Sequence, residues 1–480
     1  MNWRREGAPQ LWFTAAAVAL SLLMVAGLFL LVLVQGAVFF WPRDVARLEL
    51  VDGQVVVGEI VARERMAGPA ADAVPGGGGA GGDIPVSGGG PKDRRGPRYR
   101  IQVKTGNRDV YGLDFRWIPE DAIAARTYPT DITVFKRRAW GSLYGVVQEV
   151  TADGYRMQLA DGQIRLVAAA DVVAMWQPNA MSAWEKLAAY GVNVWKFLTG
   201  ELRESNTEGG IFPALFGTVL MVLLMSLAAV PLGVLAALYL REYAGQGRLA
   251  AAVRIAVHNL AGVPSVVYGA FGLGFFVYGV GGRIDQLFFA ERLPAPTFGT
   301  GGLLWASLTM ALLTVPVVIV ATEEGLAAIP AAQREASLAL GATRWETVRH
   351  VILPRALPAV LTGAILAVAR AAGEVAPLML TGVVKVAPAL AIDGTPPFVH
   401  LYRKFMHLGF HIYDAGFQSP NVEAARPMVF ATTLVLLGLI TALNLAAMVL
   451  RQRVRRRYQR FPTASRWRCG TSPWTLPPGG

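Results

Sequence analysis

The stretch REASLALGAT at residues 334–343, followed by VILP at residues 351–354, is the part of this 480-residue sequence that decides its fold. We expect a short helix that starts at about Ala331 and ends at Gly341, because glycine adopts the positive φ at which many helices stop. A second short helix is predicted just after this turn, and Pro354 falls close to the start of the next long apolar segment, where proline is tolerated. The pattern therefore predicts a compact helix-turn-helix, although an ordinary amphipathic loop at a membrane surface would also fit.

Six apolar stretches are long enough to cross a bilayer, whose core of roughly 30 Å needs about 20 helical residues. The chain is 54% hydrophobic and only 16% charged, so much of it must face lipid rather than water. We expect an all-α polytopic membrane bundle. Prolines within the stretches, such as Pro264 and Pro377, are compatible with it because neighbouring helices can satisfy the freed carbonyl groups. The expected spans are Leu11–Phe40, Ala214–Leu240, Ile255–Val280, Leu303–Ala321, Leu357–Thr381 and Met428–Leu450.

Arginines beside the apolar stretches set the expected orientation. Arg4 and Arg5 precede the first stretch and predict a cytoplasmic N-terminus, and six crossings return the C-terminus to the same side. The first stretch is too long for a typical signal peptide and lacks a clean small-residue cleavage site, so we expect an uncleaved helix. The net charge of +12 is then explained by the arginines expected on the cytoplasmic side of the spans, and nucleic-acid binding is not expected. The sequence predicts a multi-pass protein of the bacterial plasma (inner) membrane with both termini cytoplasmic.

Residues 42–208 differ from the apolar stretches and are expected to form a small periplasmic, mainly-β domain. Short alternating runs flank Asp-Gly pairs such as Asp52-Gly53, which are the strongest short signal for a β-hairpin. Residues 67–97 are rich in Gly and Pro without apolar periodicity and are interpreted as a flexible insertion. A capping box at residues 182–185 predicts a closing helix with one apolar face. The domain offers no catalytic constellation, so a docking or spacer role is the simplest hypothesis, with contact to a solute-binding partner as the alternative.

The expected organisation has four parts. They are the cytoplasmic N-terminus with the first span at 1–41, the β domain at 42–208, the transmembrane core at 209–450 with a loop at 322–355, and a basic cytoplasmic tail at 451–480.

The chain lacks the signals of an enzyme. No Gly-Lys dipeptide occurs anywhere in it, so the phosphate-binding loop G-x-x-x-x-G-K-[ST] of ATPases is absent. The single cysteine, Cys469, excludes an intrachain disulfide framework. His407 and His411 have a spacing that could bind a metal, but the aromatic residues around them favour an interfacial helix. We therefore expect no cofactor, no metal site and no enzymatic activity.

Two charged residues fall within the fifth apolar stretch, in ARAAGEVAPL at residues 369–378. A charge at the centre of a membrane helix costs about 2.5–3.5 kcal/mol on insertion scales, so the two must pair or face water. Arg370 and Glu374 are four residues apart and are expected to be neighbours on one helical face. They form either a structural ion pair or part of a substrate path. In the second case Arg370 would attract an anion such as phosphate, while Glu374 would accept a hydrogen bond from a protonated oxyanion, which sulfate cannot donate.

The spacing E-A-x-x-x-x-G, then nine residues, then aliphatic-x-L-P resembles the EAA loop of ABC importer permeases. Ser337 and Val351 depart from the usual Ala and Ile, which are small changes. The stretch at 369–378 resembles the PstA-type permeases of bacterial phosphate ABC importers, as do PALFGT at 213–218 and NLAGVPS at 259–265. The resemblance covers about residues 210–450.

The resemblance implies a type I ABC importer permease fold whose coupling loop docks on a separate ATPase. It implies import of inorganic phosphate with a PstC-like second permease, PstB-like ATPase subunits and a periplasmic PstS-like phosphate-binding protein as partners, besides membrane lipid. Three alternatives stay open: a permease for another oxyanion such as sulfate or molybdate, a regulatory phosphate-sensing membrane protein, and a secondary carrier, against which the loop argues. The loop residues implied in ATPase coupling are Glu335, Ala336, Gly341 and Pro354.

Overall fold

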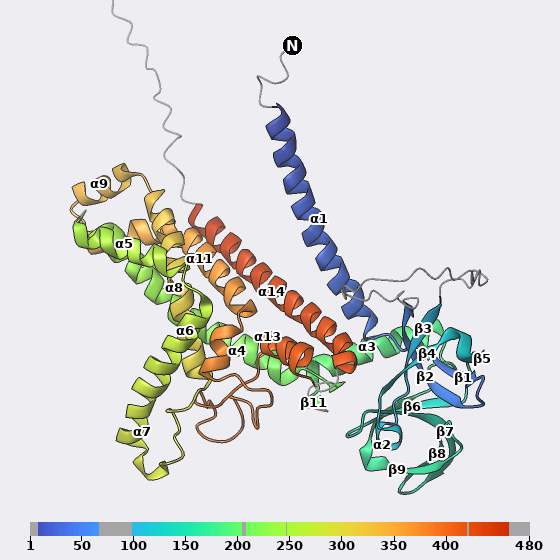
Figure 1. Cartoon of the computed structure of the whole chain (residues 1–480). Helices are drawn as coiled ribbons and strands as arrows, with labels where there is room; N and C mark the ends of the chain where they lie inside the picture. Colours follow the sequence, from blue (N-terminus) through green and yellow to red (C-terminus); the bar gives the residue numbers. More distant parts are fainter. Residues whose placement is uncertain (1–7, 67–97, 204–207, 246, 420–421, 460–480) are drawn as a thin grey trace, which may run out of the picture. The chain divides into compact units, whose positions relative to one another are not determined.

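The computed structural model describes residues 8–66, 98–203, 208–245, 247–419 and 422–459 (Figure 1). The flexible insertion expected at 67–97 and most of the basic tail lie outside these residues. The chain divides into two compact units. One comprises Met1–Phe212 with Ile412–Leu434, and the other Pro213–His411 with Val435–Gly480.

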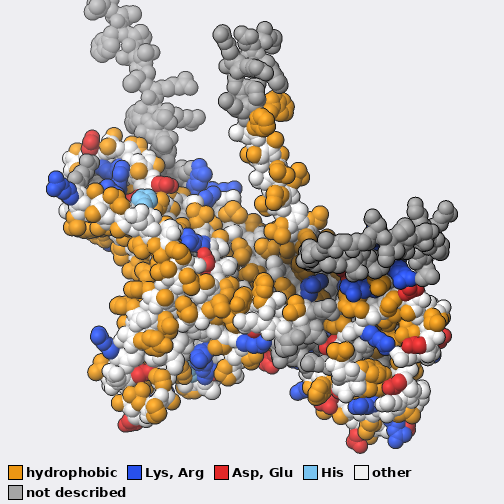
Figure 2. Space-filling view, viewed as in Figure 1, with side chains coloured by type: hydrophobic (Ala, Val, Ile, Leu, Met, Phe, Trp, Pro, Cys, Tyr) orange, Lys and Arg blue, Asp and Glu red, His pale blue; other side chains and the backbone are white. Residues whose placement is uncertain are grey.

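The described residues contain six helices that are long and apolar enough to cross a membrane, which confirms the predicted number. Figure 2 shows hydrophobic side chains over much of the visible face of the second unit, with Lys and Arg side chains gathered around α9 and α5. This distribution fits helices that meet lipid along their length and water at their ends. The six spans are Trp12–Val38, Phe212–Tyr243, Ser265–Phe288, Leu303–Ala327, Arg344–Gly373 and Ala425–Arg456.

Helix α8 (Leu303–Ala327) is the most buried of the six spans and forms the centre of the second unit. Its neighbours approach closely through glycines: a Cβ at Gly233 of α4 (Phe212–Leu238) would lie 2.7 Å from Val318. A Cβ at Gly363 would lie 2.9 Å from that of Ala321. Membrane helices associate through such close packing of small residues, because lipid gives them little hydrophobic driving force to pair.

The third predicted span, Ile255–Val280, is wrong at its start. Helix α5 (Arg248–Leu260) ends before a turn, and a separate helix α6 (Ser265–Phe271) begins the span, which continues through the wide turns of η5 (Gly272–Gly281) into α7 (Gly282–Phe288). Pro264 lies at the break and precedes the first helical residue. Proline cannot donate a backbone hydrogen bond and disfavours a helical residue before it, so the helix cannot run through this position.

The fifth predicted span, Leu357–Thr381, is also wrong, because the structure breaks it near its end. Helix α11 (Leu353–Gly373) stops, and a short helix α12 (Ala376–Thr381) follows. Pro377 accounts for the break, since in a continuous helix its ring would clash with the carbonyl group of Gly373, four residues before it.

Residues 45–176 contain the predicted β structure as two five-stranded antiparallel sheets (Figure 1). Each sheet has its own apolar core, built on Leu48 and Ile101 in the first and on Phe135 and Met157 in the second. The first sheet has the order β4-β3-β2-β1-β5 and contains β1 (Val45–Leu50), β2 (Val55–Arg65), β3 (Tyr99–Lys104), β4 (Phe115–Pro119) and β5 (Ile123–Thr127). The second has the order β10-β6-β7-β8-β9 and contains β6 (Ile132–Arg137), β7 (Ser142–Thr151), β8 (Gly154–Gln158), β9 (Ile164–Ala168) and β10 (Val172–Trp176).

The two sheets repeat one structural unit. In each, the first four strands follow one another, a single 3-10 turn joins the fourth strand to the fifth, and the fifth pairs with the first. The registers correspond as well: Val45 faces Glu59 as Ile132 faces Val146. A bulge follows Ile60 in the second strand of one copy and Val147 in that of the other. Sequence analysis missed this repeat because residues 67–97 separate β2 from β3 in the first copy only.

Helix α3 (Ala183–Thr199) closes the β region and begins with the predicted capping box. The Ser182 hydroxyl accepts a hydrogen bond from the Glu185 backbone at 3.4 Å, and the Glu185 carboxylate accepts one from the Ser182 backbone at 2.7 Å. Two orphan donors of the first turn are thereby satisfied.

Candidate functional site

A helix-turn-helix joins α8 to α11, as the sequence predicts. Helix α9 (Ala331–Ala339) ends at a turn in which Gly341 has φ +87°, the left-handed conformation that favours glycine. Helix α10 (Arg344–Thr347) starts with a capping box of its own, in which the Glu346 backbone donates to the Thr343 hydroxyl at 3.2 Å. It leads through the wide turn η7 (Val348–Ile352) into α11, whose first turn contains Pro354.

Arg334 connects this loop to the ends of two membrane helices. Its guanidinium donates to the backbone carbonyls of Leu326 and Ile329, at 2.8 and 2.7 Å, which lie at the end of α8 and just beyond it. The same guanidinium pairs with Glu242 at 2.9 Å, in the turn η4 (Tyr239–Tyr243) that ends the α4 span. Ser337 and Thr347 join the two arms of the loop through their hydroxyls, 2.9 Å apart. The loop is therefore joined to the ends of both α8 and the α4 span by direct contacts.

Sequence analysis missed the Arg334–Glu242 pair, because the two residues are 92 positions apart and no spacing rule links them. It also missed a second arginine of the same kind: Arg254 of α5 donates to the Leu240 carbonyl at 2.8 Å and pairs with Glu323 at 3.3 Å.

Replacing Arg334 by alanine is expected to destabilise the chain by about 3 kcal/mol, because Glu242 would stay largely buried without its cation and two helix-end carbonyls would lose their donor. Chemical unfolding in a mild detergent measures the effect. Glu242→Ala and the double variant Arg334→Ala/Glu242→Ala complete a mutant cycle, in which the double variant should lose less than the sum of the two single variants. Strictly additive losses would show that the two side chains do not stabilise each other.

The tip of the loop exposes apolar side chains that a protein normally buries. Leu340 is 90% exposed, Trp345 57% and Leu338 44%, and the predicted residues Glu335, Ala336 and Gly341 are exposed beside them. The backbone beneath is held by the caps and the Arg334 contacts. A rigid apolar projection of this kind is typical of a surface that another protein covers.

The second predicted pair, Arg370 and Glu374, lies at the break between α11 and α12. Arg370 is in the last turn of α11, whereas Glu374 has extended backbone, so the prediction of one continuous helical face is wrong. The two side chains still approach, with 3.7 Å between Arg370 Nε and Glu374 Oε1. Their side chains are 34% and 25% exposed. At this separation the pair lacks a hydrogen bond of normal length, so the arginine keeps donors available to a further acceptor.

Two other segments of the chain pack closely against this break. Helix α6 packs against α12 so closely that a Cβ at Gly269 would lie 2.7 Å from Pro377 Cα. On another side, a Cβ at Gly409 would lie 2.8 Å from Val375. Non-helical backbone at the level of a bundle is tolerated where protein surrounds it or where it lines an aqueous cavity. The break between α11 and α12 is therefore packed against protein on these two sides.

His407 lies fully buried in the segment next to Gly409, and its Nδ1 accepts a hydrogen bond from the Gly409 backbone at 3.1 Å. Burial lowers the pKa of His407 from 6.5 to about 3. No group of three or more His, Cys, Asp or Glu side chains that could hold a metal occurs in the part of the chain that the structure describes.

The depressed pKa predicts that the folded chain loses stability as the pH falls. Between pH 6.5 and 3 the unfolded state binds a proton at His407 that the folded state excludes, so stability decreases by about 1.4 kcal/mol per pH unit. From pH 6.5 to 5 we expect a loss of about 2 kcal/mol from this residue. Asparagine at 407 keeps an acceptor for Gly409 but cannot titrate, so the unfolding free energy of His407→Asn should depend less on pH by that amount. Identical pH profiles in both proteins would contradict the prediction.

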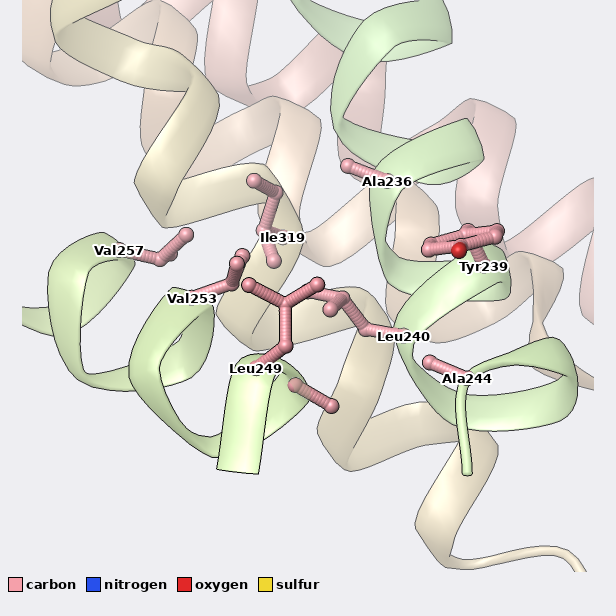
Figure 3. A pocket seen from close by; sticks show the side chains of 9 residues that line it. Ala236, Tyr239, Leu240, Ala244, Leu249, Val253, Val257 and Ile319 are labelled. Carbon is pink, nitrogen blue, oxygen red and sulfur yellow. The ribbon is translucent and has the colours of Figure 1, made fainter. Parts of the chain in front are cut away.

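An apolar pocket between η4, α5 and α8 is not a candidate for an anion site (Figure 3). Its lining contains no charged side chain, and the hydroxyl of Tyr239 is the only polar side-chain group. The lining residues are Ala236, Tyr239, Leu240, Ala244, Leu249, Ala250, Val253, Val257 and Ile319.

Comparison with known proteins relates residues 229–456 to transport proteins. Residues 229–456 match the model of a family described as "Binding-protein-dependent transport system inner membrane component". The chain is 31% identical over 236 residues to the probable ABC transporter permease protein YqgI of Bacillus subtilis, covering 48% of this chain and 74% of that protein. It is 31% identical over 253 residues to the probable phosphate transport system permease protein PstA of Methanocaldococcus jannaschii, covering 52% and 76%.

Further relatives match over a shorter part. The chain is 37% identical over 172 residues to the phosphate transport system permease protein PstA 1 of Mycobacterium tuberculosis, which covers 36% of this chain and 51% of that protein. The chain thus spans about half to three quarters of the length of the relatives named here. A chain in a solved structure of the MetNI methionine ABC transporter aligns with 51% of this chain over 94% of its own length, at 19% identity and a TM-score of 0.36.

Proposed function

The chain belongs to the family of binding-protein-dependent transport system inner membrane components, the permeases of ABC transporters, and on this premise we propose that it imports inorganic phosphate as a PstA-type subunit. It is a multi-pass membrane protein and a transport subunit rather than an enzyme. The relatives named as phosphate permeases support the substrate class. In this chain, the observation that supports phosphate import is the Arg370–Glu374 pair at the helix break, whose 3.7 Å separation leaves donors of the arginine available to an anion.

Phosphate suits the Arg370–Glu374 pair for chemical reasons. The guanidinium is a planar fork that can donate two parallel hydrogen bonds to oxyanion oxygens. Near neutral pH phosphate also retains at least one proton, which it can donate to the Glu374 carboxylate, whereas sulfate has none. In this proposal Glu374 also moderates the positive charge of Arg370, so that the anion binds and is released.

The coupling role is assigned to the exposed tip of the loop. Glu335, Ala336 and Gly341 would lie in a cleft of a separate PstB-like ATPase, with Leu340 as an apolar contact. Pro354, in the first turn of α11, marks where the loop passes into a membrane helix. The Arg334 contacts support this role, because they would transmit a displacement of the loop to α8 and α4.

The proposed orientation places both termini and the loop 322–355 in the cytoplasm, and the β domain of 42–208 in the periplasm. Residues 1–41 then hold the first span, 209–450 the transport core and 451–480 a basic tail. A PstC-like permease would complete the pathway, and a PstS-like binding protein would deliver phosphate. The arginines that flank the spans support this orientation.

Proteoliposomes containing the chain with its proposed partners test the substrate. We expect ATP-dependent accumulation of radiolabelled phosphate that excess sulfate or molybdate does not inhibit. Inhibition by either anion at equal concentration would favour the alternative of a broader oxyanion permease. Normal assembly without any transport would favour a regulatory protein, and accumulation without ATP would favour a secondary carrier.

A further inference from the structure

Helix α3 has two faces with opposite surroundings. Lys186, Tyr190 and Phe197 share one face, and this face packs against other residues of the first unit. On the opposite face, Trp184 is 80% exposed, Leu187 52% and Trp195 67%. Their positions lie within about 80° of one another around the helix, so the three side chains form one apolar stripe along it.

The packed face fixes α3 to the end of the first membrane span, α1 (Ala8–Val38). The Phe197 ring lies edge-on to Phe39 and Phe40, with centroids 5.6 and 5.1 Å away. The Asn193 amide donates to the Phe40 carbonyl at 3.1 Å, and Lys186 pairs with Asp44. These contacts hold α3 where the chain leaves the first span.

The C-terminal end of α3 is also linked to the start of the second span. The backbone of Ile211 donates to the Phe197 carbonyl at 2.8 Å, and that of Phe212, the first residue of α4, donates to Gly200 at 3.1 Å. The C-terminal part of α3 is therefore tied both to the residues that directly follow α1 and to the first residue of α4. The exposed stripe lies on this same short helix.

We propose that α3 is an interfacial helix whose Trp184, Leu187 and Trp195 side chains enter the lipid headgroup region of the membrane face at which α1 ends and α4 begins. Tryptophan is enriched at this depth because its ring is apolar and its N–H is polar. An amphipathic helix in this position buries its apolar face about 5–10 Å into the boundary between headgroups and acyl chains. Glu185 and Lys196, which border the stripe, would remain in water.

The anchoring has a consequence for the β region. The same helix that contacts lipid pairs with Asp44, directly before β1, and follows β10 in the chain. Insertion of α3 would therefore hold the linkers at both ends of the two sheets at the membrane surface. This inference does not depend on the transported substrate.

Site-specific labelling of the whole chain in liposomes tests the proposal. The single native cysteine is removed by Cys469→Ser. An environment-sensitive fluorophore is attached in turn to Trp184→Cys, Leu187→Cys and Trp195→Cys. Glu185→Cys and Lys196→Cys are matched controls, since each lies next to a test position but about 100° away around the helix. All five side chains are exposed, so the substitutions leave the packed face intact. Glu185→Cys also removes the carboxylate of the capping box, so its helicity is compared with that of Lys196→Cys by circular dichroism.

At the three test positions we expect blue-shifted emission, strong quenching by a nitroxide attached near the lipid headgroup, weaker quenching by one near the chain end, and protection from aqueous iodide. The two controls should show the reverse preference, with quenching mainly by iodide. Equal quenching by iodide at all five positions would place the stripe in water and overturn the proposal. Protection from both lipid and aqueous quenchers would mean that protein covers the stripe, which would also overturn it.

Discussion

Arg370→Ala is expected to reduce phosphate uptake by roughly tenfold to a hundredfold, because the variant loses charge-assisted hydrogen bonds worth about 1.5–3 kcal/mol. Lysine at this position keeps the charge but not the planar fork, so Arg370→Lys should recover only part of the rate. Glu374→Gln keeps the shape of the side chain and removes its charge. This variant should lose the preference for a protonated anion, and sulfate should then inhibit phosphate uptake.

Uptake of radiolabelled phosphate by the reconstituted complex measures these effects, with ATPase co-purification as the check on assembly. Arg283→Ala is the matched control, since it removes an exposed arginine from α7, outside the break between α11 and α12. A purely structural ion pair would lower the amount of assembled complex but leave the sulfate sensitivity of the remainder unchanged. Normal uptake in both Arg370→Ala and Glu374→Ala would remove the pair from the substrate path.

The sequence predicted those features that depend on neighbouring residues. The turn at Gly341 and the capping box of Ser182 with Glu185 each involve a few consecutive positions, so local conformational preference determines them. The number of membrane spans could also be predicted, because the hydropathy signal of a span extends over about 20 residues. The role of the loop, by contrast, came from its resemblance to a family.

The features that the sequence did not predict depend on breaks in regular structure or on distant contacts. Hydropathy continues unchanged through Pro264 and Pro377, so an apolar window merges two helices that proline separates. For the same reason Glu374 was predicted to lie on a helical face. Its side chain is nevertheless close to that of Arg370, as predicted, although the helix breaks between them. The Arg334–Glu242 pair required the tertiary fold, since it joins the loop to a different span.

These missed contacts matter for the mechanism that we propose. A displacement of the loop reaches the membrane helices through contiguous contacts. Arg334 and Arg254 supply such contacts at two helix ends, where each binds a carboxylate and at least one backbone carbonyl. The exposed tip, by contrast, contributes little to the stability of the isolated chain. Substitutions at the tip should therefore separate ATPase docking from folding.

Leu340→Glu is expected to weaken association with the ATPase by at least tenfold and to abolish ATP-driven uptake, while the chain itself remains as stable as before. A leucine buried in a partner contributes about 1.5–3 kcal/mol, and a buried unpaired carboxylate adds a further penalty. Because Leu340 is 90% exposed in the isolated chain, its unfolding free energy should change by less than about 0.5 kcal/mol. Binding of the purified ATPase and unfolding in detergent, measured on one preparation, give both quantities.

Leu249→Glu is the matched control, because Leu249 is 80% exposed on α5, outside the loop. Gly341→Val should act differently from Leu340→Glu: a β-branched residue at φ +87° strains the turn itself, so it should lower stability as well as docking. Glu335→Ala should impair coupling to the ATPase without lowering the stability of the chain. If Leu340→Glu bound the ATPase and supported uptake as well as Leu249→Glu did, the tip could not be the docking surface, and the motor would have to act on the bundle elsewhere.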